Sequence, residues 1–216
     1  KYLLFILNKD LIILCHLGMT GKFYIQKNKK RSKTSFYYKI KEREDKHNHL
    51  IFYFNKKISL IYNDVRRFGF IKIIDKNNIK NISHLKNLGP EPMSKDFNKK
   101  YFCHYIKKIK KRSIKNLLMD QKFVAGLGNI YVNEILFLSK ISPLKKVSSI
   151  KNEKFSKIIK TIKKILKISI KEGGSSIKDF SSSEGEEGSF QQQFKVYGKK
   201  DENCPTPECS GLIERI

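Results

Sequence analysis

The sequence FVAGLGNIY, at residues 123–131, lies at the start of an apolar run with helical spacing. Its two glycines let the backbone approach a ligand closely, and the first turn of a helix offers N–H groups to a phosphate. The sequence has neither a G-x-G-x-x-G pattern nor a lysine followed by serine or threonine after these glycines, which disfavours a nucleotide-binding loop. A simple corner between two helices, without any ligand, is the alternative reading.

Helical periodicity extends on both sides of this stretch. Upstream, Ser94 and Ser113 are each expected to cap a helix. Downstream, helices are expected at residues 130–138 and 150–171. The last one has an apolar stripe on one face and lysines on the other, and a glycine pair at 173–174 ends it. We expect the stripe to be core and the lysines to form a solvated face.

The first part of the chain has the short β-prone runs of a sheet domain. Strands are expected at residues 2–7, 11–17, 22–26, 50–54, 59–62 and 70–74. Residues 8–10 are expected to form a hairpin turn, and the basic residues 27–33 a polar loop.

The spacing of apolar residues changes from a period of two, typical of strands, to a period of 3.6, typical of helices, after residues 88–92, LGPEP. The two prolines in this segment make a stiff extended link. We therefore expect four segments: a strand-rich part at 1–88, a linker at 89–93, a helical part at 94–190, and a short β-type tail at 191–216.

Composition favours a polyanionic partner. The 216 residues include 46 Lys and Arg against 20 Asp and Glu, which gives a net charge of +26. A field of this strength attracts nucleic acids, although a compositional bias toward lysine would give the same total. No run approaches the roughly 20 apolar residues of a membrane-spanning helix, and no targeting signal is visible.

The four cysteines give no secreted disulfide framework. Cys15 and Cys103 lie in apolar or helical surroundings and are expected to be packing residues. Cys204 and Cys209 are separated by four residues, a spacing that zinc ribbons use. This pair supplies only half of the four ligands that tetrahedral zinc requires.

Several sequence blocks together resemble one known family. In chain order they are HLGMTG at 16–21, YNDVRRFG at 62–69, LGPEP at 88–92, LMDQK at 118–122, NIYVNE at 129–134, GGSSIKDF at 173–180 and GSFQQQFKVYGK at 188–199. Each block alone is modest, but in this order they are similar to the formamidopyrimidine-DNA glycosylases, truncated at both ends.

The resemblance implies an α+β multidomain fold. Its parts are a β-sandwich N-terminal lobe that lacks its first part, a helix–two-turn–helix domain, and the first half of a C-terminal zinc-ribbon finger. It also implies one structural zinc ion, held by Cys204, Cys209 and two further cysteines beyond residue 216. The partner implied is damaged double-stranded DNA, bound by a monomer in the bacterial cytoplasm, without any membrane.

The activity implied is base-excision repair. Members of the family remove oxidised purines, namely 8-oxoguanine and formamidopyrimidines, and then cut the abasic strand by β,δ-elimination through a Schiff base. The nucleophile is the amine of an N-terminal proline, followed by a glutamate acid, and neither residue precedes Lys1. Lys1 aligns with the catalytic lysine of the family. We therefore expect the parent protein to be an enzyme and residues 1–216 alone to be inactive.

The resemblance also assigns DNA-binding residues. Met19, Arg66 and Phe68 match the side chains that fill the void left by a flipped nucleotide. Core packing is the alternative for Met19 and Phe68. Further matched positions are the DNA contacts His47, Arg66 and Lys110, the phosphate contacts Lys115 and Asn129, and the lesion-capping loop 175–185. The register near Lys110 leaves Lys111 as an alternative.

Three other functions remain open. An endonuclease VIII-like glycosylase for oxidised pyrimidines shares the fold, but it generally lacks the three void-filling residues. A non-catalytic damaged-DNA-binding protein would use the basic surface for affinity alone. A ribosomal-type RNA-binding protein would explain the charge but not the ordered blocks.

Overall fold

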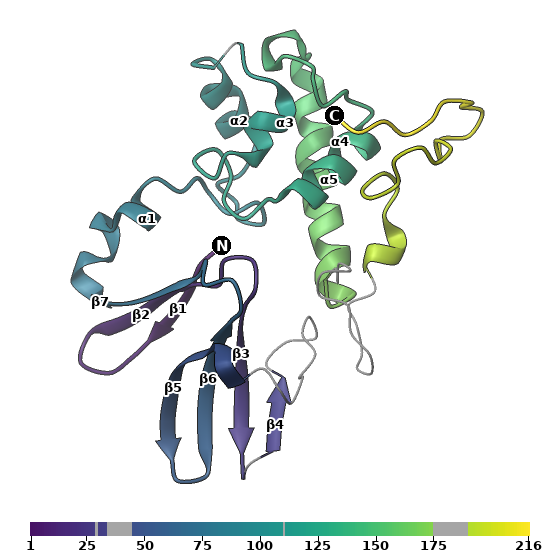
Figure 1. The fold of residues 1–216 in the computed structure, drawn as a ribbon. Helices are drawn as coiled ribbons and strands as arrows, with labels where there is room; N and C mark the ends of the chain where they lie inside the picture. The colour runs from purple at the N-terminus through teal and green to yellow at the C-terminus, as the bar shows by residue number, and fades with distance from the viewer. Residues whose placement is uncertain (29, 34–44, 110, 175–189) are drawn as a thin grey trace. The chain divides into compact units, whose positions relative to one another are not determined.

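The computed structural model describes residues 1–28, 30–33, 45–109, 111–174 and 190–216. The chain divides into two compact units, of which the first includes Lys1–Lys86 and the second comprises Asn87–Glu172 and Phe190–Ile216. The first is built from strands and the second from helices (Figure 1).

The strand unit contains two antiparallel sheets. One has the order β1-β2-β7 and the other the order β4-β3-β6-β5. The strands are β1 (Leu3–Ile6), β2 (Leu11–His16), β3 (Gly21–Lys27), β4 (Lys30–Lys33), β5 (Asn48–Asn55), β6 (Ile58–Asp64) and β7 (Phe70–Asp75). Short helical turns follow at η1 (Asp45–His47), η2 (Lys76–Asn81) and α1 (Ser83–Lys86).

A small apolar core joins the two sheets. Cys15 from one sheet and Phe23 and Tyr62 from the other are buried together. The ring of Phe5, on β1, meets the ring of Phe23 edge-on at a centroid distance of 5.6 Å. The six expected strands are confirmed, and the buried apolar residues of this unit lie on β2, β3 and β6.

Two local expectations in this unit have different outcomes. The turn at residues 8–10 is confirmed, with Lys9 and Asp10 at the positive φ values of 59° and 54° that tight hairpins require. The polar loop expected at 27–33 is wrong, because Lys30–Lys33 forms β4 and pairs with β3. Ladder hydrogen bonds come from the backbone, and lysine is common on edge strands, so composition concealed this strand.

The helical unit is organised around one long helix. Its helices are α2 (Lys99–Ile106), α3 (Ile114–Met119), α4 (Asn129–Ser139) and α5 (Asn152–Lys171), with short turns at η3 (Val147–Ser149) and η5 (Phe190–Gln193). Both α2 and α4 pack against α5, and α3 packs against α4 (Figure 1). The stripe expected on α5 is confirmed, since Phe155, Ile158 and Ile162 are fully buried.

Of the two serines expected to cap helices, Ser113 does so and Ser94 does not. Ser113 is the N-cap of α3, and its hydroxyl accepts a hydrogen bond from the Asn116 N–H. Ser94 caps no helix; the N-cap of α2 is Asn98, whose side chain accepts from the Tyr101 N–H. The Ser94 N–H instead donates to the Glu91 carbonyl within a turn, so the helix begins five residues later at Lys99.

The tail forms a short hairpin, which we call the cysteine hairpin (residues 201–213). An isolated antiparallel bridge joins Asn203 to Leu212. The Cys204 N–H donates to the Gly211 carbonyl at 2.8 Å. Among the described residues, no helix is long and apolar enough to cross a bilayer.

Candidate nucleic-acid interface

Met19, Arg66 and Phe68 come together at one surface of the strand unit, and we call this group the wedge. Arg66 Nη1 lies 3.4 Å from Met19 Sδ, and the Arg66 guanidinium carbon lies 4.6 Å from the centre of the Phe68 ring. Met19 is 59% exposed and Phe68 is 56% exposed. Core packing is therefore wrong for both side chains. A cation between two apolar groups suits insertion into a base stack.

The carboxylate of Asp64, at the end of β6, holds the two segments that carry the wedge. It accepts hydrogen bonds from the Thr20 hydroxyl, the Gly69 N–H at 2.8 Å and the Tyr62 hydroxyl at 3.1 Å. The Thr20 hydroxyl in turn accepts from the Arg66 N–H at 3.0 Å. One buried carboxylate thus ties residue 20, beside Met19, to the turn that carries Arg66 and Phe68.

These hydrogen bonds set the ionisation of Asp64. Burial by itself would raise the pKa of this carboxyl, but hydrogen bonds from Thr20, Gly69 and Tyr62 outweigh burial and lower the pKa below its ordinary value. Burial, with Asp64 beside it, raises the pKa of Tyr62, so the phenol stays a donor. The network is therefore intact at neutral pH.

Close backbone approach requires glycine beside Met19. Gly18 has φ +61°, and a Cβ there would lie 2.7 Å from the carbonyl carbon of Phe68. Its N–H donates to His16 Nδ1 at 3.1 Å, and burial lowers the pKa of His16, which favours the neutral ring that can accept. Any other residue at position 18 would push Met19 away from Phe68.

The strand unit contains two further predicted residues, His47 and Lys1. His47 ends η1 and is half-buried, whereas His49 contacts the carbonyl oxygen of Asp64 through Nε2 at 2.8 Å. Lys1 directly precedes Tyr2 and β1. Burial lowers the pKa of its side chain, which makes proton release easier than from an ordinary lysine.

In the helical unit, residues 123–128 form a loop between α3 and α4, which we call the phosphate loop. Asn129 is the first residue of α4, and its side-chain oxygen accepts from Asn133 at 3.2 Å. The N-cap of α4 is Gly128, which has no side chain to cap the helix. At such a helix start, backbone N–H groups and the helix dipole favour the binding of an anion from a ligand.

Lys115 lies in the first turn of α3. Its backbone N–H donates to Pro143, and its ammonium donates to the carbonyl oxygen of Ile216 at 3.1 Å. The predicted contacts Lys115 and Asn129 thus occupy the first turns of successive helices. Lys110 and the loop 175–185 lie outside the described residues.

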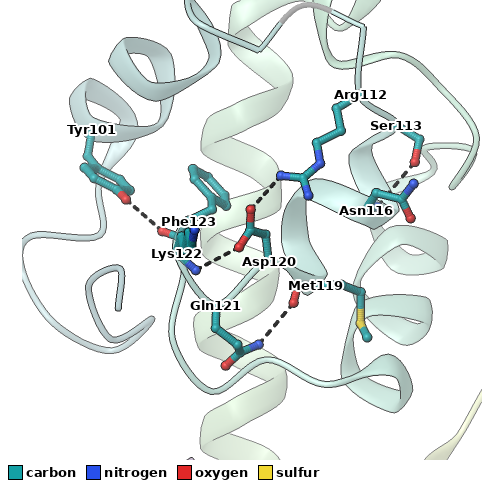
Figure 2. A network of polar contacts seen from close by, with 9 residues as sticks. All are labelled: Tyr101, Arg112, Ser113, Asn116, Met119, Asp120, Gln121, Lys122 and Phe123. Carbon is teal, nitrogen blue, oxygen red and sulfur yellow. Dashed lines mark hydrogen bonds and ion pairs between the residues drawn. The ribbon is translucent and has the colours of Figure 1, made fainter. Parts of the chain in front are cut away.

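A polar network surrounds the entry to the phosphate loop (Figure 2). Asp120 accepts from Arg112 Nη1 at 2.6 Å and from the Lys122 N–H at 2.9 Å. Burial alone would raise the pKa of Asp120, but these partners lower it. The Tyr101 hydroxyl donates to the Phe123 carbonyl at 2.8 Å, so α2 is linked to the loop.

The linker motif at 88–92 also lies against this loop. The Gly89 N–H donates to the Gln121 carbonyl at 2.8 Å, and the Ala125 N–H donates to the Pro90 carbonyl at 3.1 Å. Two motifs that are distant in sequence are therefore joined by backbone hydrogen bonds within the helical unit.

Glu134 of α4 anchors the segment that leads to the cysteine hairpin. The residue is only 2% exposed, and its carboxylate accepts from three consecutive N–H groups, those of Lys195, Val196 and Tyr197, at 2.8, 3.0 and 2.8 Å. These bonds satisfy a charge that would otherwise be costly to bury. They attach the tail to the helix that begins at Asn129.

The cysteine hairpin presents two sulfur atoms as potential metal ligands. The Cys209 N–H donates to the Thr206 carbonyl, and hydrogen bonds from Thr206 and then Cys209 lower the pKa of the Cys204 thiol. A lowered pKa favours the thiolate that zinc binds. Among the described residues, no group of three or more His, Cys, Asp or Glu side chains could hold a metal, and Cys204 and Cys209 would supply only two of the four ligands that tetrahedral zinc requires.

The sequence motifs include Asp64, Gln121 and Glu134, but the resemblance implies no role for these three residues. For Glu134 a signal was present, because an acid inside the apolar run of α4 requires hydrogen-bond partners if it is buried. Asp64 gave a similar signal at the end of a buried strand. Neither signal identified the partners.

Comparisons with known proteins agree with this architecture. The profile described as "Formamidopyrimidine-DNA glycosylase N-terminal domain" matches residues 1–71, and "Formamidopyrimidine-DNA glycosylase H2TH domain" matches residues 88–181. A formamidopyrimidine-DNA glycosylase from Bradyrhizobium sp. (strain ORS 278) is 36% identical over 222 residues, which cover 100% of this chain and 75% of the relative.

Solved structures are similar over the whole chain. A mutant of the Lactococcus lactis protein in complex with DNA containing Fapy-dG matches with a TM-score of 0.81 and 35% identity, covering 100% of this chain and 73% of the other. A complex described as MutM with DNA containing carbocyclic 8-oxo-G matches with a TM-score of 0.79 and 35% identity, at the same coverage of both chains.

Proposed function

The chain belongs to the formamidopyrimidine-DNA glycosylase family, and we propose that the full-length protein removes oxidised purines from DNA by base excision. Its substrates are 8-oxoguanine and formamidopyrimidines in duplex DNA, and it then cleaves the abasic strand by β,δ-elimination through a Schiff base. The observation that carries this proposal is the meeting of Met19, Arg66 and Phe68 at one exposed surface.

The wedge would act after the damaged nucleotide leaves the stack. Met19 and Phe68 present apolar groups that can occupy the vacated space, and Arg66 has N–H donors for the base left without its partner. The hydrogen bonds of Asp64 would keep these side chains in place before DNA arrives, so that little ordering is required on binding.

Phosphate binding would be supplied by the helical unit. Asn129 at the start of α4 and Lys115 at the start of α3 are the proposed contacts with the phosphates that flank the lesion, together with Lys110. His47 is the further proposed DNA contact in the strand unit. These contacts would set the position of the duplex, because phosphates carry no direct sequence information.

Lys1 is proposed to take part in base excision and elimination. Its lowered pKa supports this role, because a proton-transferring group works best when its pKa approaches the ambient pH. The attacking amine and the glutamate acid are those that the family resemblance implies, and they are not among residues 1–216.

A structural zinc ion is proposed for the cysteine hairpin. Cys204 and Cys209 would supply two thiolates, and two further cysteines are expected beyond residue 216. The bound ion would stiffen the hairpin that Glu134 attaches to α4. We further propose that the protein acts as a monomer on the DNA of the bacterial cytoplasm.

Borohydride trapping of the full-length gene product tests the proposed chemistry. With a duplex containing 8-oxoguanine, borohydride should reduce the Schiff base and leave a covalent protein–DNA adduct. An undamaged duplex, and chloride in place of borohydride, are the controls. Tight lesion binding without any adduct would instead support the non-catalytic DNA-binding function.

A further inference from the structure

Gln121 is partly buried, and its side chain makes three hydrogen bonds to the backbone. Its side-chain Nε2 donates to the carbonyls of Met119, at 3.1 Å, and Leu127, at 2.9 Å, while Oε1 accepts from the Gly126 N–H at 2.7 Å. The residue lies directly after the C-cap of α3, beside Asp120 (Figure 2). One side chain thus joins the end of α3 to the last residues of the phosphate loop.

Only an amide side chain can make this set of bonds. A glutamine offers two N–H donors and one acceptor oxygen, whereas an ionised glutamate offers no donor and a methionine offers only a weakly accepting sulfur. The backbone carbonyl of Gln121 also accepts from Gly89, so the residue is fixed at both ends. The amide is therefore held in one orientation, and its hydrogen bonds fix the backbone at Gly126 and Leu127.

The loop that Gln121 holds has space for a ligand. Gly126 has φ +89°, a conformation that favours glycine. Gly128 has φ −121°, which any residue adopts, and a Cβ added there would meet nothing within 4 Å. The protein interior therefore does not require glycine at position 128, but a ligand that approaches the backbone would.

We propose that Gln121 is a positioning residue for phosphate binding. Its side-chain amide holds Gly126 and Leu127 so that the backbone at Gly128 and the start of α4 receive one DNA backbone phosphate beside Asn129. This inference rests on the proposed function, since the phosphate is that of a DNA duplex. Gln121 itself does not touch the phosphate.

Substitution Q121M tests the inference in the full-length protein. The variant keeps the length of the side chain and removes all three hydrogen bonds. Binding is measured by fluorescence anisotropy on an 8-oxoguanine duplex and on the same duplex with one lesion-strand phosphate at a time replaced by neutral methylphosphonate. The control variant is Q192M, which makes the same chemical change at an exposed position of η5.

Q121M should weaken binding about tenfold on the normal duplex, and the loss should vanish on the duplex whose bound phosphate is neutral. Q121M and N129A should also combine to less than the sum of their separate effects, because both act on the same phosphate. Q192M should match the wild type. Equal loss by Q121M on every duplex would show a role in folding alone and overturn the inference.

A second variant keeps the inference testable if Q121M folds poorly. In G128A the added methyl group meets open space in the free protein, so the melting temperature should fall only by the modest preference of an N-cap for glycine over alanine, while DNA binding falls at least about tenfold. Wild-type binding by G128A would overturn the loop as the phosphate site. A wild-type protein that does not prefer the lesion duplex would instead contradict the proposed function.

Discussion

At the scale of single residues, the chemistry of the strand unit depends on one buried carboxylate and three exposed side chains. Asp64 determines where Met19, Arg66 and Phe68 stand, because it bonds both segments that carry them. Two of the exposed side chains, Met19 and Phe68, are apolar, and the charged Arg66 lies against both of them. Two substitutions distinguish Phe68, which would contact DNA, from Asp64, which holds the wedge in place.

Replacement of Phe68 by alanine should weaken binding to an 8-oxoguanine duplex by about tenfold and binding to the undamaged duplex by less than about twofold, because a void exists only after flipping. Competition binding on both duplexes measures the ratio. F54A is the matched control, since Phe54 is a 69% exposed phenylalanine of β5. Equal loss on both duplexes would remove the wedge role from Phe68.

Replacement of Asp64 by asparagine should lower the free energy of unfolding by about 1–3 kcal/mol at pH 7, because an amide cannot accept all three hydrogen bonds. The pKa of Asp64 is lowered in the folded state, so its stabilising contribution is complete above the ordinary carboxyl pKa and fades as pH falls below it. The difference between the two proteins should therefore shrink from pH 5 down to about pH 3.

Urea denaturation at several pH values checks this expectation. D10N is the control, because Asp10 is exposed and lies 3.6 Å from Lys76, a surface pair that contributes little. A D64N deficit that stays constant from pH 7 to about pH 3 would contradict an ionised Asp64 as the organising group.

At the scale of elements, α4 connects two features that are far apart in sequence. Its first residue, Asn129, is a proposed phosphate contact, and Glu134 in its middle bonds the segment before the cysteine hairpin. The phosphate loop and the hairpin are thereby attached to the same rigid helix. Their joint position on DNA should depend on the Glu134 carboxylate.

The E134Q variant should release this segment. An amide nitrogen in place of one oxygen would face N–H donors, so we expect about 2–3 kcal/mol of local stability to be lost. Hydrogen exchange should become faster at the amides of Lys195, Val196 and Tyr197. E153Q is the control, because Glu153 is exposed in the first turn of α5. Unchanged protection at residues 195–197 would show that other contacts hold the tail.

At the scale of the whole molecule, a strongly positive chain carries its proposed DNA contacts on two units. The net charge of +26 brings any polyanion close, but it provides no specificity. Specificity for the lesion would come from the wedge in one unit, whereas the phosphate loop and the cysteine hairpin in the other would position the duplex. The proposed zinc ion matters here because it would keep the hairpin ordered on the bound duplex.

Removal of zinc from the full-length protein should weaken DNA binding by at least about tenfold, because metal binding supplies folding energy to small hairpins. Metal analysis before and after chelation, together with binding assays, measures both effects. C204S and C209S should lose the metal, and C15A should retain it because Cys15 is buried elsewhere. A metal-free preparation with full DNA affinity would contradict the zinc proposal.

The sequence was sufficient to predict the family from the order of its motifs. It also predicted the division into strand-rich and helical parts and most strands and helices, because apolar periodicity and turn residues act over short distances. It failed at β4, where lysines concealed an edge strand, and at Ser94, where Asn98 offered the better cap. The long-range hydrogen bonds, in contrast, are visible in the folded chain alone. Asp64 meets Thr20 across 44 residues, and Glu134 meets Lys195 across 61, because the folded path of the backbone, not local pattern, brings such groups together.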